Sequence, residues 1–309
     1  MEKSRASIPI KFIEMRVGIT GASGMLGSAL VTHLSKSHEI FATSRSKGEE
    51  GINIEWDCFN ITNTSLLNKW LNKIKPDILI HCAAIVNVDH CENNVKLATK
   101  IHVESTEVIA NFLVSNGGRF FYISTDGVFD GEKQKAYFEL DLVNPLNVYA
   151  KTKVLGEKIV CSMDKGLVLR TNIIGSTPKG KTSFVEWLID SLNDNTPLKL
   201  HHDRYFSPLH VDKLSFIIEK IIKYPIFGLY HCASCDSISK YEFGKKMAEI
   251  FQLSYSNVTR FSTDAAEFKA RRPKNMALNS EKLSKKLQYD IPSVIDSIIY
   301  MKNKYDSEL

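Results

Sequence analysis

A tyrosine and a lysine four residues apart, Tyr149 and Lys153, have the residue types and the spacing for acid–base chemistry. On a helix this spacing places both side chains on one face, with Cβ atoms roughly 6 Å apart. An isolated tyrosine has a pKa of about 10, and we expect the neighbouring ammonium to lower it by favouring the phenolate. Such a tyrosine can donate a proton to a carbonyl oxygen as hydride reaches the carbon, or reverse that step. A solvent-facing helix pair is the alternative interpretation.

A hydroxyl for the same chemistry precedes this pair in the sequence. Arg119 to Ser124 has the pattern of a buried strand, and Thr125 and Asp126 follow at its carboxyl end. In a doubly wound parallel sheet, that end of a strand faces the ligand crevice. We expect Thr125 to hydrogen-bond the carbonyl oxygen and to stabilise charge there. Asp126 either orients the substrate or caps the loop.

Three glycines, Gly21, Gly24 and Gly27, follow the first short apolar run and precede a segment with helical spacing. Glycine lets the backbone turn tightly and approach a pyrophosphate, and the helix N-terminus adds free N–H groups and a positive dipole end. At the first strand–helix turn, this G-x-x-G-x-x-G pattern predicts a dinucleotide site. A glycine-rich turn without a ligand is the alternative.

The residues after the second strand bear on the choice of cofactor. An NAD site usually offers Asp or Glu there for the ribose 2′-hydroxyl. This chain has Ser44 and Arg45 instead, which suit a 2′-phosphate. The sequence therefore favours NADP(H), while NAD(H) stays an option. Asp57, beyond the run Ile52 to Trp56, is either an acceptor for the adenine amino group or a turn-forming residue.

Alternating strands and helices must position these residues. The expected strands are 16–20, 39–43, 77–81, 119–124, 167–170 and 228–233, and the expected helices are 24–36, 64–74, 96–115, 149–161, 183–192, 211–223 and 240–251. This alternation predicts an α/β fold, a Rossmann-like doubly wound parallel sheet with helices on both faces.

The length of 309 residues suggests about two structural units. Residues 15–175 are predicted to form an NAD(P)-binding Rossmann domain. Residues 176–309 are predicted to form a smaller α/β substrate-binding lobe, interleaved with the last strands of the sheet and ending in a polar, basic tail. Residues 1–14 are predicted to be an N-terminal extension, because Met15 directly precedes the first strand.

Composition excludes several classes of protein. The chain is 43% hydrophobic and 24% charged, which is typical of a globular protein. The net charge of +5 comes without any Lys/Arg run longer than a pair, so no nucleic-acid partner is expected. No apolar run approaches the roughly 18 residues of a membrane helix, so no membrane partner is expected either. Six cysteines without a signal peptide indicate reduced thiols in the cytoplasm, and Cys232 and Cys235 lack the second pair of a zinc site.

Five segments between Met15 and about Leu283 together resemble the extended short-chain dehydrogenase/reductases. More narrowly, they resemble the RmlD-like branch, the dTDP-4-dehydrorhamnose reductase family. The segments are Met15–Gly27, His81–Glu92, Ile123–Gly131, Glu139–Glu157 and Arg271–Leu278. The implied reaction is reduction of a 4-keto group on a nucleotide-linked deoxysugar by NADPH or NADH.

The resemblance implies a role for each segment. Thr125, Tyr149 and Lys153 would form the catalytic trio. Cofactor contacts would come from Gly24, Met25 and Leu26 at the diphosphate and from Ala83, Ala84 and Ile85 after the third strand, besides Gly21, Gly27, Ser44, Arg45 and Asp57. Arg271 and Arg272 would clamp the diphosphate of the nucleotide sugar, because Arg forks suit phosphate. A solvated basic tail is the alternative for these two arginines.

This chain departs from the family pattern around the sugar. Gly127 stands where the family usually has Tyr, and Asn172 stands where it usually has Trp, and both aromatic residues help to hold the sugar. The family's Asp-Gln-x-Gly-x-Pro-Thr loop appears as residues 203–209, and His102 occupies a helix position that often carries Asn. The catalytic residues are intact and the sugar pocket is altered, so the sequence leaves the particular sugar open.

Other functions fit the same segments. A nucleotide-sugar 4-epimerase or 4,6-dehydratase would share the fold, but dehydratases generally carry Asp-Glu after the strand-end Thr, where this chain has Asp126 and Gly127. The RmlD-like branch also includes the regulatory subunit of methionine adenosyltransferase, which uses the fold to bind a partner. The sequence leaves a homodimer open as well.

Overall fold

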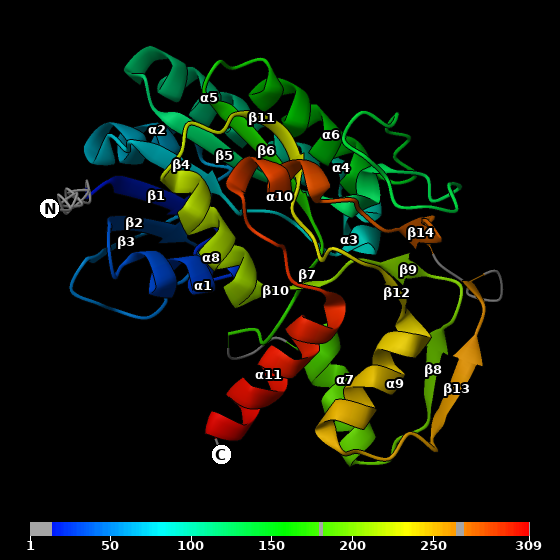
Figure 1. Cartoon of the computed structure of the whole chain (residues 1–309). Helices are drawn as coiled ribbons and strands as arrows, with labels where there is room; N and C mark the ends of the chain where they lie inside the picture. Colours follow the sequence, from blue (N-terminus) through cyan, green and yellow to red (C-terminus); the bar gives the residue numbers. More distant parts are fainter. Residues whose placement is uncertain (1–13, 179–181, 264–268, 309) are drawn as a thin grey trace, which may run out of the picture.

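The computed structural model of the chain describes residues 14–178, 182–263 and 269–308 (Figure 1). Residues 1–13 of the predicted N-terminal extension lie outside the described residues. Among the described helices, none combines the length and the apolar character needed to cross a membrane.

A seven-stranded parallel sheet forms the centre of the larger lobe, with the strand order β11-β6-β5-β4-β1-β2-β3. Its strands are β1 Arg16–Thr20, β2 Glu39–Ser44, β3 Ile54–Cys58, β4 Ile78–His81, β5 Arg119–Thr125, β6 Gly166–Thr171 and β11 Gly228–His231. Because β1 lies between β2 and β4, the connections on its two sides run in opposite directions, which opens a crevice at the carboxyl ends of β1 and β4. The predicted Rossmann-like fold is confirmed.

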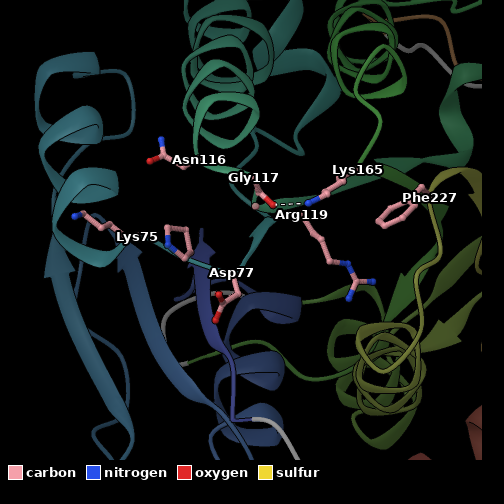
Figure 2. Close-up of a pocket in the computed structure, with 9 residues that line it drawn as sticks. Lys75, Asp77, Asn116, Gly117, Arg119, Lys165 and Phe227 are labelled. Atoms are coloured by element: carbon pink, nitrogen blue, oxygen red, sulfur yellow. Dashed lines mark hydrogen bonds between the residues drawn. The ribbon is translucent and has the colours of Figure 1, made fainter.

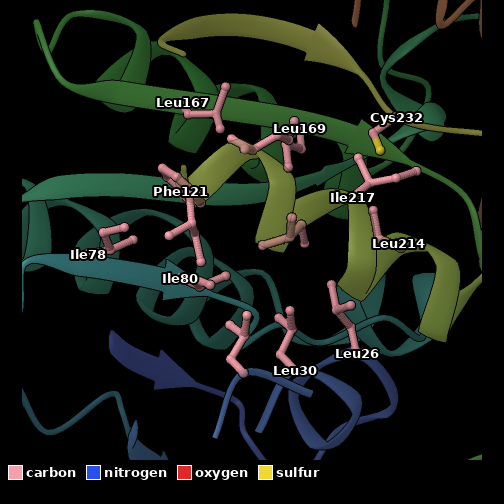
Figure 3. Packing of buried hydrophobic residues seen from close by; sticks show 14 of the residues in the cluster. Leu26, Leu30, Ile78, Ile80, Phe121, Leu167, Leu169, Leu214, Ile217 and Cys232 are labelled. Carbon is pink, nitrogen blue, oxygen red and sulfur yellow. The ribbon is translucent and has the colours of Figure 1, made fainter. Parts of the chain in front are cut away.

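Both faces of this sheet are covered, because the strand side chains alternate between two apolar layers. The helices of this lobe are α1 Met25–Leu34, α2 Thr64–Ile74, α5 Ser105–Asn116, α6 Val148–Cys161, α8 Val211–Ile222 and α10 Glu281–Leu287. Ile78 and Ile80 of β4 pack with α1 and α8 on one face (Figure 3), whereas Leu79 packs with α2 and α5 on the other. Helix α8, strand β11 and helix α10 come from the C-terminal half of the chain and complete this lobe.

The smaller lobe has its own apolar core. Its main elements are α7 Phe184–Asn193, α9 Lys240–Phe251, α11 Val294–Glu308, the parallel pair β8 Leu198–His201 and β13 Val258–Phe261, and the three-stranded sheet of β12 Ile238–Ser239, β9 Tyr205–Phe206 and β14 Asn275–Met276. Strand β7, Ile173–Ile174, also forms a short parallel pair with β10, Leu209–His210. The prediction of a polar tail after residue 251 is wrong, because Val294, Ile298 and Met301 form a buried helical face of α11.

Candidate active site

The glycine loop lies between the carboxyl end of β1 and the start of α1. Gly21 has a φ of +65°, and a Cβ atom there would lie 2.6 Å from the backbone of the segment after β4. A Cβ atom at Gly27 would lie 2.2 Å from the Gly21 carbonyl oxygen. Gly24 is the N-cap of α1, whose first turn has no side-chain cap and no acidic residue. The backbone N–H groups of Met25 and Leu26 therefore belong to a helix N-terminus in which a diphosphate fits.

Ser44, Arg45 and Asp57 lie on the strands next to this loop. Ser44 ends β2 and its hydroxyl donates to the Ser46 carbonyl oxygen, while Arg45 beside it is exposed. Asp57 lies within β3 and not beyond it, and its carboxylate accepts a hydrogen bond from Lys73 at 2.9 Å. The ion pair with Lys73 gives Asp57 a structural role, and its contact with adenine stays a prediction.

A buried histidine connects the predicted cofactor segment Ala83–Ile85 to the catalytic helix. The expected helix over 96–115 is interrupted by a π-helical turn, Lys100–Glu104, between α4 Val95–Thr99 and α5. Within this turn, the Nε2 of His102 accepts a hydrogen bond from the backbone N–H of Ile85 at 2.9 Å. Because Nε2 is an acceptor, Nδ1 carries the proton and donates it to the Thr152 hydroxyl of α6 at 2.7 Å. Burial lowers the pKa of His102 to about 2, so the ring is neutral.

Thr125 ends β5 and Asp126 follows it, at the carboxyl edge of the sheet. The Thr125 hydroxyl donates to the Asp126 carboxylate and accepts from the Gly127 N–H, both at 3.1 Å. The Asn172 amide donates to the other carboxylate oxygen of Asp126. Burial raises the pKa of Asp126, and the hydrogen bonds from Asn172 and Thr125 oppose the rise. Both residues thus stand in one buried network beside the crevice.

Tyr149 lies in the first turn of α6, which Asn147 caps by accepting from the Ala150 N–H. Its ring stands edge-on to His102, with the centroids 5.7 Å apart. Burial raises the pKa of Tyr149 above its ordinary value, and a hydrogen bond with Thr125 opposes the rise. The expected lowering of this pKa is therefore wrong in direction, since burial disfavours the phenolate more than its surroundings favour it.

Lys153 lies one turn further along α6 and is buried, whereas Tyr149 is part-buried. Its Nζ donates to the Ile123 carbonyl oxygen of β5 at 2.7 Å and lies 3.9 Å from the centre of the Tyr122 ring. Burial lowers the pKa of Lys153 to about 7, against the attraction of Glu157 one turn beyond it. Tyr149, Lys153 and Glu157 share the inner face of α6, so the predicted i, i+4 geometry is present and the solvent-facing alternative is wrong.

The two predicted arginines have different surroundings. Arg272 forms an ion pair with Asp89 of α3 (Val88–Asn93) at 2.7 Å, while Arg271 is exposed. The Arg271 carbonyl oxygen accepts from Asn147, the N-cap of the catalytic helix, at 2.9 Å. The C-terminal segment is thereby fixed beside the N-terminus of α6, and its contact with a diphosphate stays a prediction.

Sequence reasoning missed two cations that complete this region, Arg204 and Lys240. Both attract the Asp126 carboxylate, and Lys240 packs on the ring of Phe206 with 3.3 Å between Nζ and the ring centre. Their distance from Thr125 in the sequence exceeds 75 residues, so no local motif could place them there. The altered loop at residues 203–209 was the available signal for Arg204, and the sequence offered none for Lys240.

A hollow of about 420 Å³ lies at the opposite edge of the sheet (Figure 2). Asp77, Arg119 and Lys165 line it at the amino ends of β4, β5 and β6. The Arg119 guanidinium donates to the carbonyl oxygens of Ile221 and Ile222 at the end of α8. This hollow is therefore far from the predicted catalytic residues, and the Arg119 side chain that lines it stabilises the end of α8. In the parts of the chain that the structure covers, no three His, Cys, Asp or Glu side chains are grouped to hold a metal ion.

The fold and the crevice of this chain are those of the extended short-chain dehydrogenase/reductases. This class of oxidoreductases uses NADP or NAD. Within that class the chain belongs to the family described as RmlD substrate binding domain, whose model matches residues 15–305. The predicted family and enzyme class are thus confirmed.

Similar proteins include dTDP-4-dehydrorhamnose reductases and a subunit of methionine adenosyltransferase. A crystal structure of dTDP-4-dehydrorhamnose reductase from Bacillus anthracis in complex with NADP is 28% identical, with a TM-score of 0.83 over 96% of this chain and 100% of that one. A dTDP-4-dehydrorhamnose reductase from Aggregatibacter actinomycetemcomitans is 26% identical over 87% of this chain and 92% of its own length. Methionine adenosyltransferase 2 subunit beta from Xenopus laevis is 32% identical over 87% of this chain and 82% of its own length.

Proposed function

We propose that this protein is an NADPH-dependent reductase of a nucleotide-linked 4-keto-6-deoxysugar, similar to dTDP-4-dehydrorhamnose reductase. The observation that carries the proposal is the placement of Thr125, Tyr149 and Lys153 at the carboxyl edge of β5 and on the inner face of α6. The glycine loop beside them packs closely at Gly21 and Gly27, where a Cβ atom would clash with the backbone, and it opens a helix N-terminus that suits a diphosphate. The six unpaired thiols fit a reducing compartment, and we place the enzyme in the cytoplasm.

Each catalytic side chain has one task in this reaction. NADPH, when bound, supplies the hydride for the carbonyl carbon. Tyr149 donates its phenolic proton to the carbonyl oxygen, and its raised pKa keeps that proton in place at neutral pH. Thr125 donates a hydrogen bond to the same oxygen as negative charge develops there. Lys153 holds the ribose of the cofactor with the ammonium that now lies against Ile123.

NADPH is the favoured cofactor, with NADH as the second choice. Ser44 and the exposed Arg45 stand at the end of β2, beside the glycine loop, where a ribose 2′-phosphate would lie. The complex of the Bacillus anthracis reductase with NADP supports this choice. The nucleotide diphosphate of the sugar would lie along Arg271 and Arg272.

NADPH oxidation with a panel of dTDP-, GDP- and UDP-linked 4-keto-6-deoxysugars tests the proposal. We expect turnover with at least one sugar, and a loss of about 10²- to 10⁴-fold in kcat for Tyr149→Phe with NADPH binding retained. Tyr224→Phe, which removes an exposed phenol, is the matched control. Turnover that survives Tyr149→Phe would overturn the mechanism.

The 32% identity to methionine adenosyltransferase 2 subunit beta favours a second candidate function, a non-catalytic NADP-binding subunit. That function predicts NADP binding with no turnover of any sugar in the panel. It also predicts that the chain comigrates with a methionine adenosyltransferase catalytic subunit in gel filtration. The inward-facing Tyr149 and the buried Lys153 support the reductase, because a binding subunit has no need of the phenol.

A further inference from the structure

A buried carboxylate on the inner face of α6 has no assigned task in the proposed reaction. Glu157 lies one turn after Lys153 and two turns after Tyr149, and its side chain is 5% exposed. Its carboxylate accepts hydrogen bonds from the Ser124 hydroxyl at 2.5 Å, from the Arg170 Nε at 2.9 Å and from the Arg170 Nη2 at 2.7 Å. This one side chain therefore joins α6 to both β5 and β6.

The register of the large sheet brings the two donors to this carboxylate. Ser124 of β5 pairs with Arg170 of β6, so their side chains leave the same face of the sheet on neighbouring strands. On that face, Tyr122 and Val168 pack in one apolar cluster with Val160 of α6. The hydroxyl and the guanidinium therefore point towards the helix that carries the carboxylate.

The cost of burying charge indicates what this cluster supplies. A buried ion pair often adds no more stability than packed apolar side chains of the same volume, because both ions lose their hydration. A bidentate pair adds direction, since Arg170 and Glu157 meet through two hydrogen bonds in a fixed fork. The ring of Phe129 also packs on the guanidinium, with its centre 5.1 Å from the Arg170 Cζ. The carboxylate is therefore held in one orientation, in which it also binds Ser124.

The relative position of β5 and α6 matters because the two proposed donors to the substrate oxygen lie on these elements. Thr125 ends β5, and Tyr149 lies in the first turn of α6. Lys153 also links the two elements, through the Ile123 carbonyl oxygen. In the proposed reaction, however, its ammonium holds the cofactor ribose. The contact of Glu157 with β5 is a link that has no ligand to bind.

We propose that Glu157 is a positioning residue, whose carboxylate holds β5 against α6 through Ser124. This contact brings Thr125 and Tyr149 to the same carbonyl oxygen. Glu157 and Ser124 are both buried, so they act through their neighbours and not on the substrate. The inference rests on the proposed reductase function and adds to it a residue outside the catalytic trio.

A split between kcat and KM tests this inference, because misplaced reacting groups slow the reaction without removing a contact to the substrate. The assay uses NADPH and the most rapidly reduced member of the panel of 4-keto-6-deoxysugars. Ser124→Ala removes one hydroxyl and leaves the ion pair of Glu157 with Arg170. We expect kcat to fall about tenfold, while KM for the sugar and Kd for NADPH stay within about twofold. Single-turnover NADPH oxidation should slow by the same factor, because it measures the chemical step directly.

A second variant removes the whole cluster without leaving an unpaired buried charge. Glu157→Met combined with Arg170→Met replaces the ion pair by apolar side chains, which a folded chain can tolerate. Its single-turnover rate should fall about ten- to a hundredfold. Ser215→Ala is the matched control for Ser124→Ala, because the Ser215 hydroxyl is also buried and donates to the Val211 carbonyl oxygen within α8. This control should keep kcat within about twofold.

A single-turnover rate within twofold of the unchanged chain, for Ser124→Ala or for the folded double variant, overturns the inference. An equal loss of rate in Ser215→Ala does so too, because the effect would then be one of stability alone. Ser124→Ala keeps the ion pair, so it decides even where the double variant fails to fold. Failure of the inference alone leaves the unchanged chain active. If the unchanged chain oxidises no NADPH with any keto sugar, the reductase proposal fails and the inference falls with it.

Discussion

Part-buried Tyr149 and buried Lys153 both lie on the inner face of α6, and loss of solvent there moves their pKa values in opposite directions because it disfavours phenolate and ammonium alike. The phenol stays protonated at neutral pH, which suits a general acid in a reduction. Lys153 has a pKa of about 7, so its ammonium titrates near neutral pH. The i, i+4 spacing identified these two residues, but only the burial of each could fix its protonation.

The lowered pKa of Lys153 predicts a pH dependence of folding. Between pH 7 and 10.5 the unfolded chain binds a proton at this lysine that the folded chain has released, so this group makes the free energy of unfolding rise with pH. The slope from one such group approaches about 1.4 kcal/mol per pH unit. Urea unfolding at several pH values from 7 to 9 should show a smaller slope for Lys153→Met than for the unchanged chain. Equal slopes would contradict the assigned pKa.

At the scale of elements, the π-helical turn Lys100–Glu104 connects the predicted cofactor segment to α6, the predicted catalytic helix. A regular helix over 96–115 satisfies the apolar pattern of the sequence, and the pattern gave no sign of the extra residue in the turn. In the structure the turn places His102 between Ile85 and Thr152, with a hydrogen bond to each. Local patterns thus predicted the helix but not the residue that it presents to the site.

His102→Ala should loosen the contact between this turn and the cofactor segment. Losing two buried hydrogen bonds and leaving the Ile85 N–H unsatisfied should cost about 1–3 kcal/mol of folding free energy. It should also raise the Kd for NADPH, because Ile85 lies in the predicted cofactor segment. Thermal unfolding and NADPH fluorescence titration measure the two effects. His102→Asn should lose less than His102→Ala, and the exposed His90→Ala should change neither quantity.

Gly156 sets the distance between α6 and the elements beneath it. A Cβ atom there would lie 2.2 Å from the Tyr122 hydroxyl and 2.8 Å from the His102 carbonyl oxygen. Since the second neighbour is backbone, the helix must move, and Gly156→Ala should destabilise the fold by about 1–3 kcal/mol. Because Tyr149 and Lys153 are on this helix, kcat should fall as well. Lys151→Ala, exposed on the same helix, should stay within about 0.5 kcal/mol of the unchanged protein in urea unfolding.

At the scale of the whole molecule, the sequence predicted what depends on neighbouring residues and missed what depends on distant ones. The glycine loop and the Tyr149–Lys153 pair are local patterns with fixed spacing, and both lie where expected. Arg204 and Lys240 meet only because β12 and β9 pair across the second lobe. Helix α11 was missed although its apolar face was readable, because charged residues on its other face suggested a tail.

The two lobes are joined through α8, which packs in the core of the first lobe while its first turn contacts α11 of the second. Ile217 is buried in that first core, and Asp212 at the start of α8 accepts hydrogen bonds from Tyr300 and Lys304 of α11. Such mutual support predicts a single cooperative unfolding transition. Ile217→Ala should therefore cost about 2–5 kcal/mol and lower the urea midpoint of both lobes together.

Trp187 on α7 reports on the second lobe, and it can be isolated by Trp56→Phe and Trp70→Phe. In that background, Ile217→Ala should shift the Trp187 emission and the far-UV circular dichroism to the same lower urea concentration. Val114→Ala, an exposed position of α5, should shift neither by a measurable amount. A Trp187 transition that stays in place while the circular dichroism moves would mean that the second lobe folds independently. In that case the contacts between α8 and α11 would contribute little to stability.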